Sequence, residues 1–185
     1  MTFAAPIGVS LDHLTIKMND RFFEKMATVV EGNERAELVP KMMKGSFQGI
    51  MNFEAVICHT AKRMCADADV SLWDFAKTNN GKSLIMYPAA EDNFLVSNAN
   101  NYSDNRVDSR IFGIMISIMT FNHASWHFHG KDDALSETFA ELYHALSDAF
   151  YSTVDAMVHE ADSDATAEEK EQISAMSSAV YSFLD

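Results

Sequence analysis

Basic residues are scarce in this sequence. It has 14 lysines and arginines against 27 aspartates and glutamates in 185 residues, a formal net charge of −13 at pH 7. Nucleic acids and anionic membranes attract clusters of lysine and arginine, so this deficit argues against a general nucleic-acid or membrane-surface binder. A basic partner fits the charge better, although an acidic excess can also serve solubility alone.

Cysteines, glycines and long apolar runs are also few. Cys58 and Cys65 lie seven residues apart in one expected helix, about 10.5 Å along its axis, which is too far for a disulfide within that helix. Seven glycines leave no phosphate-binding glycine loop. The most apolar run, residues 111–121, is far shorter than the roughly 20 residues that span a bilayer. Since residues 1–10 show no signal peptide, we expect a cytoplasmic protein with reduced thiols.

The periodicity of apolar residues predicts an α+β fold in a single domain, residues 1–185. In the first third we expect a short strand or extended arm, a helix beginning at Asn19 or Asp20, a helical turn and a firmer helix. These elements are expected at residues 12–18, 20–30, 36–44 and 52–66.

The middle of the chain changes to a strand-like pattern. Three short segments are rich in aromatic and β-branched residues and are separated by turn formers, which predicts a small antiparallel meander of about three to four strands. The segments are residues 72–77, 83–88 and 93–97, and the polar residues 98–105 after them are expected to form a loop.

A central helix should follow that loop. Asp108 stands at an N-cap position, and the apolar residues of 111–121 cover the whole circumference of a helix, so we expect protein on all its sides. Gly113 costs a helix about 1 kcal/mol relative to alanine. Its presence suggests that another backbone packs closely there.

The C-terminal third carries most of the negative charge. Residues 1–130 have 14 acidic and 12 basic side chains, whereas 131–185 have 13 acidic side chains and only Lys131 and Lys170 as bases. We expect a long helix at 134–161, a turn at 162–164 and a last helix at 167–183. The long helix has an apolar face made of Phe139, Leu142, Leu146, Phe150, Val154 and Met157.

The opposite face of the long helix is acidic. At about 100° per residue, Glu137, Glu141, Asp148 and Asp155 fall within about 60° of one another. This row, called here the acidic stripe, is the candidate partner-binding site. A solvated face of an amphipathic helix would show the same pattern, so both interpretations remain open.

Three histidines form the best metal-site candidate. His123 and His127 are four residues apart, the spacing by which zinc enzymes present two imidazoles from one helix, and His129 follows. Ala124 stands where a metalloprotease would have its glutamate. Partly buried packing beside Trp126 and Phe128 at a helix end is the alternative.

Other catalytic patterns lack support. Cys58 precedes His59, but neighbours in a helix point about 100° apart and form no thiolate–imidazole pair. No serine lies in a nucleophile elbow. We therefore expect no enzyme activity and no cofactor.

Several segments in order resemble the ArdB/KlcA family of antirestriction proteins, which phages, plasmids and genomic islands encode. The family pattern N-E-R-x-x-F-L-P is similar to residues 33–40, and a glutamate ahead of an apolar run ending in a basic residue matches Glu54 and Arg63. A W-x-F strand, a turn and an M-A-P ending resemble residues 73–75, 79–81 and 86–88. The loop and helix ending in G-I fall on residues 101–114.

The chain departs from the pattern in several places: Lys82 follows Gly81 where the family has a second turn glycine, and one extra residue separates Trp73 from Pro88. Arg106 replaces a glutamate of the family, Asp108 an N-capping serine and Arg110 an aspartate, so the helix cap remains while the acidic character at the helix start is lost. The resemblance assigns residues 29–150 to an antirestriction-like core and leaves 151–185 as an acidic helical extension. It implies a compact α/β domain with a small antiparallel sheet, without known catalytic activity.

Three functional hypotheses follow. The resemblance implies a protein that inhibits host type I restriction by binding a restriction or other DNA-defence complex, and the acidic stripe would imitate DNA phosphates toward a basic surface. The same scaffold directed at another host defence system is the nearest alternative. A metal-dependent protein that uses His123, His127 and His129 is the hypothesis from another class.

Overall fold

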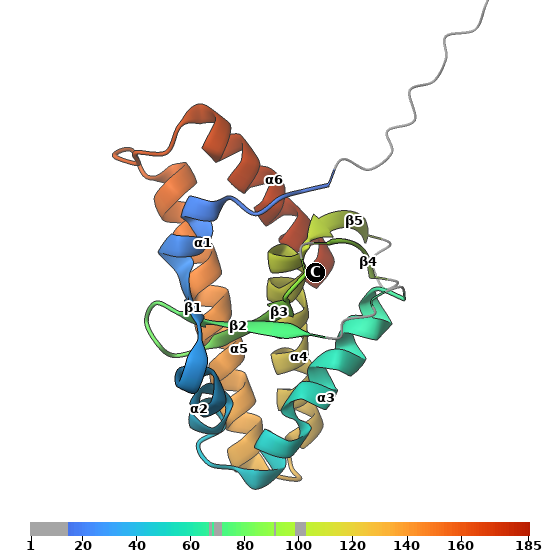
Figure 1. Cartoon of the computed structure of the whole chain (residues 1–185). Coiled ribbons are helices and arrows are strands. Elements are labelled where there is room, and N and C mark those ends of the chain that lie inside the picture. Colours follow the sequence, from blue (N-terminus) through green and yellow to red (C-terminus); the bar gives the residue numbers. More distant parts are fainter. Residues whose placement is uncertain (1–14, 67, 69–71, 91, 99–102) are drawn as a thin grey trace, which may run out of the picture.

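The computed structural model describes residues 15–66, 68, 72–90, 92–98 and 103–185 (Figure 1). The first part of the chain forms α1 (Asp20–Met26), β1 (Ala27–Val30), α2 (Gly32–Met42) and α3 (Phe47–Met64). The strands β2 (Trp73–Thr78), β3 (Leu84–Pro88), β4 (Asn93–Asn98) and β5 (Ser103–Asp108) follow. The chain ends with α4 (Ser109–Phe128), α5 (Asp133–Val154), the π-helical turn η1 (Asp155–His159) and α6 (Ala167–Leu184).

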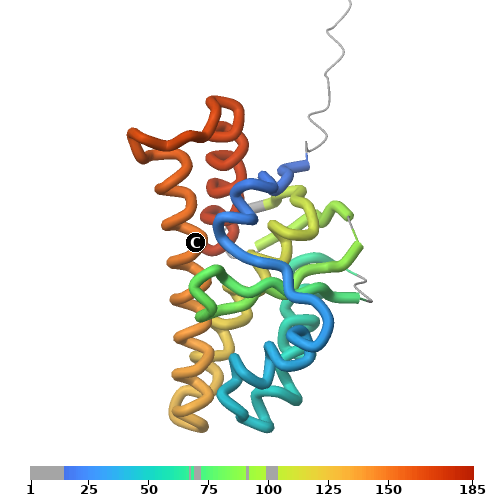
Figure 2. The backbone as a smooth tube through the Cα atoms, turned by 60° about the vertical axis from the view of Figure 1, so that its left-hand side comes forward, coloured from blue at the N-terminus to red at the C-terminus, as the bar shows by residue number. Residues whose placement is uncertain are grey.

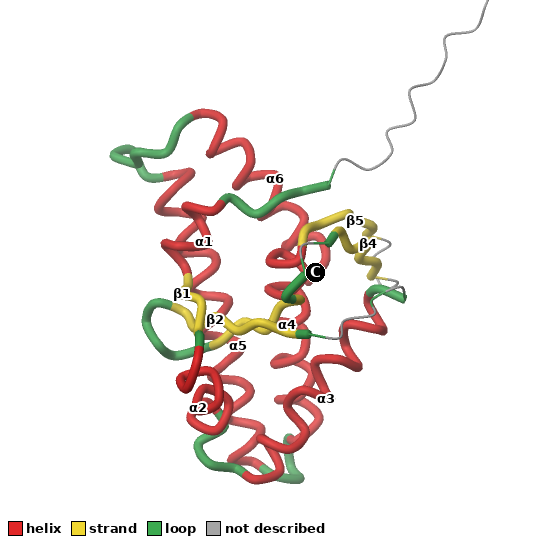
Figure 3. Tube along the Cα trace, viewed as in Figure 1, coloured by secondary structure: helices red, strands yellow, loops and turns green. Residues whose placement is uncertain are grey.

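The strands form two small antiparallel sheets, and helices pack against both, which confirms the predicted α+β class (Figure 3). One sheet has the order β1-β2-β3, and the other consists of β4 and β5. The sequence predicted one meander through residues 72–97 and a loop at 98–105. Both predictions are wrong in part, because β4 leaves the first sheet and pairs with residues 103–108.

Helix α4 explains why the first sheet ends at β3. The Met86 amide N–H points away from β2 and donates to Ser117 Oγ of α4 at 3.2 Å. Because α4 lies along this edge, β4 has no free edge of β3 to join. Phe94 of β4 packs instead on Phe112 of α4, with their ring centroids 4.3 Å apart.

The helix expected to continue to residue 30 ends at Met26. Asn19 caps its start by accepting a hydrogen bond from the Phe22 amide N–H at 2.9 Å. Residues 27–30 instead form β1, which pairs antiparallel with residues 75–78 of β2. The pairing partner lies almost 50 residues further along the chain, so tertiary contact overrides the local helical pattern.

Helices α2 and α3 begin earlier than the sequence predicted, at Gly32 and Phe47. Ser46 fixes the start of α3, because its Oγ accepts a hydrogen bond from the Gly49 amide N–H at 3.1 Å. Of the arm expected at 12–18, Ile16 forms a parallel bridge with Val107. Residues 12–14 lie outside the described residues.

Helix α4 is the central core helix that the sequence predicted. Every residue from 111 to 121 is buried. The Asp108 carboxylate caps it, accepting from the Ile111 amide N–H at 3.0 Å and the Met18 amide N–H at 2.6 Å. At Gly113 an added Cβ would overlap Cβ of Tyr87 and lie 2.8 Å from the Tyr87 Cα. The expected close approach of another backbone is confirmed, and that backbone is β3.

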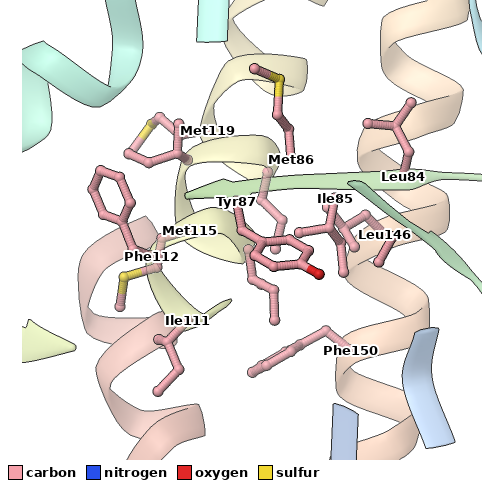
Figure 4. Close-up of a cluster of buried hydrophobic side chains, with 14 of the residues drawn as sticks. Leu84, Ile85, Met86, Tyr87, Ile111, Phe112, Met115, Met119, Leu146 and Phe150 are labelled. Carbon is pink, nitrogen blue, oxygen red and sulfur yellow. The ribbon is translucent and has the colours of Figure 1, made fainter. Parts of the chain in front are cut away.

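The core lies where β3 passes between α4 and α5 (Figure 4). All five residues of β3 are buried. Leu146 and Phe150 of α5 face this strand, and Phe112 and Met115 of α4 lie beside it (Figure 4). The sheet therefore joins the two longest helices into one core.

The C-terminal helices pack along the rest of the molecule. Figure 2 shows α6 returning beside the upper part of α5. Asn98 Nδ2 of β4 donates to the Phe183 carbonyl oxygen at 2.7 Å, which fixes the end of α6 to the second sheet. Helix α5 passes through residue 151 without a break, and the division into a core at 29–150 and an extension at 151–185 stays a prediction. In the described ranges, no helix is long and apolar enough to cross a membrane.

Candidate partner-binding surface

The acidic stripe lies on the exposed face of α5. Glu137, Glu141, Asp148 and Asp155 are all exposed. Asp155 is the first residue of the π-helical turn that continues α5. At 1.5 Å per residue the stripe is about 27 Å long. The structure thus brings the four predicted residues onto one accessible face.

Packing on the opposite face holds this helix in place. The six residues predicted for the apolar face are buried, namely Phe139, Leu142, Leu146, Phe150, Val154 and Met157. Ser83 Oγ donates to the Leu142 carbonyl oxygen at 2.8 Å, so α5 is also tied to the residue that precedes β3. The phenyl ring of Phe150 meets that of Phe22 edge to face at 5.5 Å. The stripe is therefore presented by a rigid element.

One member of the stripe has a cationic neighbour. Lys44, in the turn after α2, forms an ion pair with Glu141. Both side chains are more than half exposed, and such a surface pair contributes about 0–1 kcal/mol. Within the described part of the chain, Glu137, Asp148 and Asp155 form no ion pair. These three carboxylates are free to contact ammonium or guanidinium groups of a partner.

A second acidic cluster, which the sequence analysis did not single out, lies where α6 begins. Arg21 of α1 forms ion pairs with Asp164 and, at 3.4 Å, with Glu169. The hydrogen bond from Arg21 lowers the pKa of the Asp164 carboxyl. The backbone N–H of Thr166, followed by weaker contributions including Arg21, lowers the pKa of Glu169. Glu169 closes the capping box of α6 with Thr166, and the ion pairs of Arg21 join α1 to the start of α6.

The three candidate metal-binding histidines do not converge. His123 and His127 line a hollow between α3 and α4 together with His59, whereas His129 lines another hollow together with His144 of α5. In the ranges that the structure describes, no group of three or more histidine, cysteine or carboxylate side chains is arranged to hold a metal ion.

The N-E-R segment and the W-x-F strand, which carry part of the family resemblance, contact each other. Arg35 of α2 donates to Asp74 Oδ1 at 3.1 Å and to the Trp73 carbonyl oxygen, and its guanidinium lies 5.2 Å from the ring centroid of Phe75. Glu34 forms an ion pair with Lys77 of the same strand. These motif residues therefore position α2 on β2.

The other two motifs also meet. Gly113, in the G-I ending of the last motif, packs on Tyr87 of the segment that resembles M-A-P. The substitution of tyrosine for the family's alanine is accommodated because the Tyr87 ring points toward α1, where it meets Phe23 edge to face at 6.0 Å.

Comparison with known proteins agrees with this arrangement. Residues 66–155, which include β2 to β5, α4 and α5, match the family described as "Antirestriction protein". No curated protein matches the chain.

The fold is similar to a solved structure of the KlcA and ArdB proteins. That work describes a novel fold and antirestriction activity against type I DNA restriction systems in vivo but not in vitro. The TM-score is 0.63 at 16% sequence identity, and the match covers 86% of this chain and 94% of that chain. At 16% identity the structural match shows a shared fold, and the family match over residues 66–155 shows similarity in sequence. Together they confirm the resemblance seen in the sequence: residues 66–155 match the antirestriction protein family, and the fold is similar to that of KlcA and ArdB.

Proposed function

We propose that this protein protects incoming DNA from type I restriction systems of the host, by binding a restriction complex in the cytoplasm rather than by catalysis. The observation that carries the proposal is the family match over residues 66–155 together with the fold shared with KlcA and ArdB over 86% of the chain.

The acidic stripe supports a mechanism by protein binding. Restriction enzymes contain DNA-binding surfaces, and such surfaces are rich in lysine and arginine. Three carboxylates without an ion pair, spread over about 27 Å of a rigid helix, match the length of several phosphate spacings. Attraction between the stripe and a basic surface would speed association and would weaken as salt increases.

A plating assay tests the antirestriction activity. Unmodified phage is plated on a host with a type I restriction system, with and without expression of this protein, and modified phage serves as the control for infection. We expect plating of unmodified phage to rise while that of modified phage stays unchanged. Unchanged restriction at confirmed expression would contradict the proposed function.

A charge-reversal variant tests the mechanism separately. Replacing the four residues of the stripe with lysine should abolish protection if the stripe contacts the target. A matched variant carries the same change in net charge on exposed carboxylates of other helices, namely Glu24, Glu37, Glu54 and Glu171. Full protection by the stripe variant would leave antirestriction in place and would reject the stripe as the binding site.

A further inference from the structure

An exposed tryptophan stands out on α4. Trp126 is 72% exposed, whereas Trp73, the other tryptophan of the chain, is 9% exposed. The sequence pattern singled out the histidines beside Trp126 but not Trp126 itself. Tryptophan is enriched among the residues that dominate binding energy at protein interfaces. Packing in the core does not explain a tryptophan that is exposed on a helix.

Two hollows flank this tryptophan. One lies between α3 and α4 and has a volume of about 900 Å³, and the other lies between α4 and α5 and has a volume of about 330 Å³. Trp126 lines both. Hollows of about 300–1,000 Å³ are large enough to take side chains or a ligand. The indole therefore forms a ridge between two places where groups of a partner can fit.

In the described part of the chain, the lining of both hollows contains no carboxylate, although the net charge of the chain is −13. It contains instead one arginine and five of the seven histidines of the chain. These residues, called here with Trp126 the indole face, are His59, Arg63, His123, His127, His129 and His144.

Arg63 supplies the permanent positive charge of this face. It is absent from the ion pairs formed by the described residues, whereas Arg21, Arg35 and Arg110 each pair with a carboxylate. Burial, followed by the charge of Arg63, lowers the pKa of His123. No carboxylate of the described residues pairs with Arg63, so the charge of Arg63 acts on His123 across the hollow.

We propose that the indole face binds an acidic, partly apolar segment of a partner protein. Carboxylates of that segment would contact Arg63 and accept hydrogen bonds from the histidine rings, while its apolar side chains would occupy the hollows beside Trp126. The charge of the face is complementary to such a segment. A nucleic acid fits less well, because its many phosphates would also meet the repulsion of a strongly acidic chain. The proposal is independent of the acidic stripe, which would take a basic partner.

Binding of synthetic peptides to the full chain tests this proposal. The probe is a labelled amphipathic peptide of about four helical turns with glutamate on one face and leucine on the other. A peptide with lysine in place of glutamate and a single-stranded oligothymidine are the comparison probes. Affinity is measured by fluorescence anisotropy, and the two tryptophan indole N–H signals are followed by NMR.

We expect the glutamate peptide to bind best and to shift the indole signal of Trp126 but not that of the buried Trp73. Arg63→Glu and Trp126→Ala should each weaken binding about tenfold, which equals about 1.4 kcal/mol. Lys62→Glu is the matched control, because Lys62 is exposed on the same helix but lines neither hollow. It should change the affinity less than twofold, and far-ultraviolet circular dichroism should show that all three variants remain folded.

Three results would overturn the proposal. The first is no binding of the glutamate peptide, or binding no tighter than that of the lysine peptide. The second is equal loss in the Arg63→Glu and Lys62→Glu variants, which would reflect net charge alone. The third is preferential binding of oligothymidine that depends on Arg63, which would make the face a nucleic-acid site.

Discussion

Replacing Gly113 with alanine tests the contact on which the core depends. Alanine is favoured over glycine inside a helix by about 1 kcal/mol, so local propensity alone predicts a more stable protein. In the structure, the added methyl group would overlap Cβ of Tyr87 and lie 2.8 Å from its Cα and 2.9 Å from the Met86 carbonyl oxygen. Two of these three atoms belong to the backbone of β3, which cannot turn aside as a side chain can.

The strand also has little room to shift. Its other edge pairs with β2, and the Met86 amide N–H donates to Ser117 of α4 at 3.2 Å. Overpacking of a tight core costs about 1–3 kcal/mol and occasionally more. We take the upper overpacking cost of about 3 kcal/mol and subtract about 1 kcal/mol for the better helix propensity of alanine. Gly113→Ala should therefore lower the free energy of unfolding by about 2 kcal/mol. For a chain of this size, that corresponds to a fall in Tm of about 4–8 °C.

Thermal and urea unfolding, followed by circular dichroism, measure this change. Gly49→Ala in α3 is the matched control, since its added Cβ would meet the Leu135 Cδ1 and Met43 Sδ atoms at 3.0 Å. These are ends of flexible side chains, so we expect stability within about 1 kcal/mol of the parent. A Gly113→Ala protein as stable as the parent would refute the claim that α4 and β3 need glycine for their close approach.

Four further predictions concern single side chains. Arg35→Met keeps the apolar stem but removes the hydrogen bonds to β2, and chemical denaturation should show a loss of about 1–2 kcal/mol. In an NMR pH titration, Arg63→Gln should raise the pKa of His123, though not to its ordinary value, because burial is the larger cause; a titration curve identical to that of the parent would contradict this. The pKa of His123 is lower in the folded state than in the unfolded state. The contribution of His123 to the free energy of unfolding should therefore fall as the pH decreases below about 6.5. Burial raises the pKa of the Cys58 thiol, so at pH 8 iodoacetamide should modify Cys58 more slowly than free cysteine, and equal rates would count against its burial.

Parts of the fold could be predicted because they depend on local patterns. Asp108 is an N-cap residue that needs only the three residues after it to act, and the apolar circumference of 111–121 is sufficient to place α4 in the core. The buried and exposed faces of α5 follow from the helical period in the same way. The glycine at 113 also signalled close packing, although only the structure identifies β3 as the neighbour.

Strand pairing could not be predicted in the same way. Residues 27–30 continue a helical pattern, and their strand becomes visible only through pairing with residues 75–78. The polar segment at 103–108 has little apolar alternation, yet it pairs with all of β4. Such pairings depend on contacts far apart in sequence, and local propensity gives little information about them.

The candidate surfaces divide in the same way. The acidic stripe was predictable, since its members share one helix and helical geometry alone places them on one face. The indole face was not, because Arg63, Trp126 and His144 come from three helices. The spacing of His123 and His127 was the only local signal, and it suggested a metal site that the structure does not assemble.

The sequence by itself determined the class of fold, the buried central helix, the resemblance to the antirestriction family and the place of the negative charge. Each depends on residue order, on helical period or on composition, which are properties of the chain. Tertiary structure alone decided how the strands are divided between two sheets and which arginine and histidine side chains gather around Trp126. Both outcomes depend on α4, because its packing blocks the edge of β3 on one side and brings α3 and α5 together around its C-terminal end.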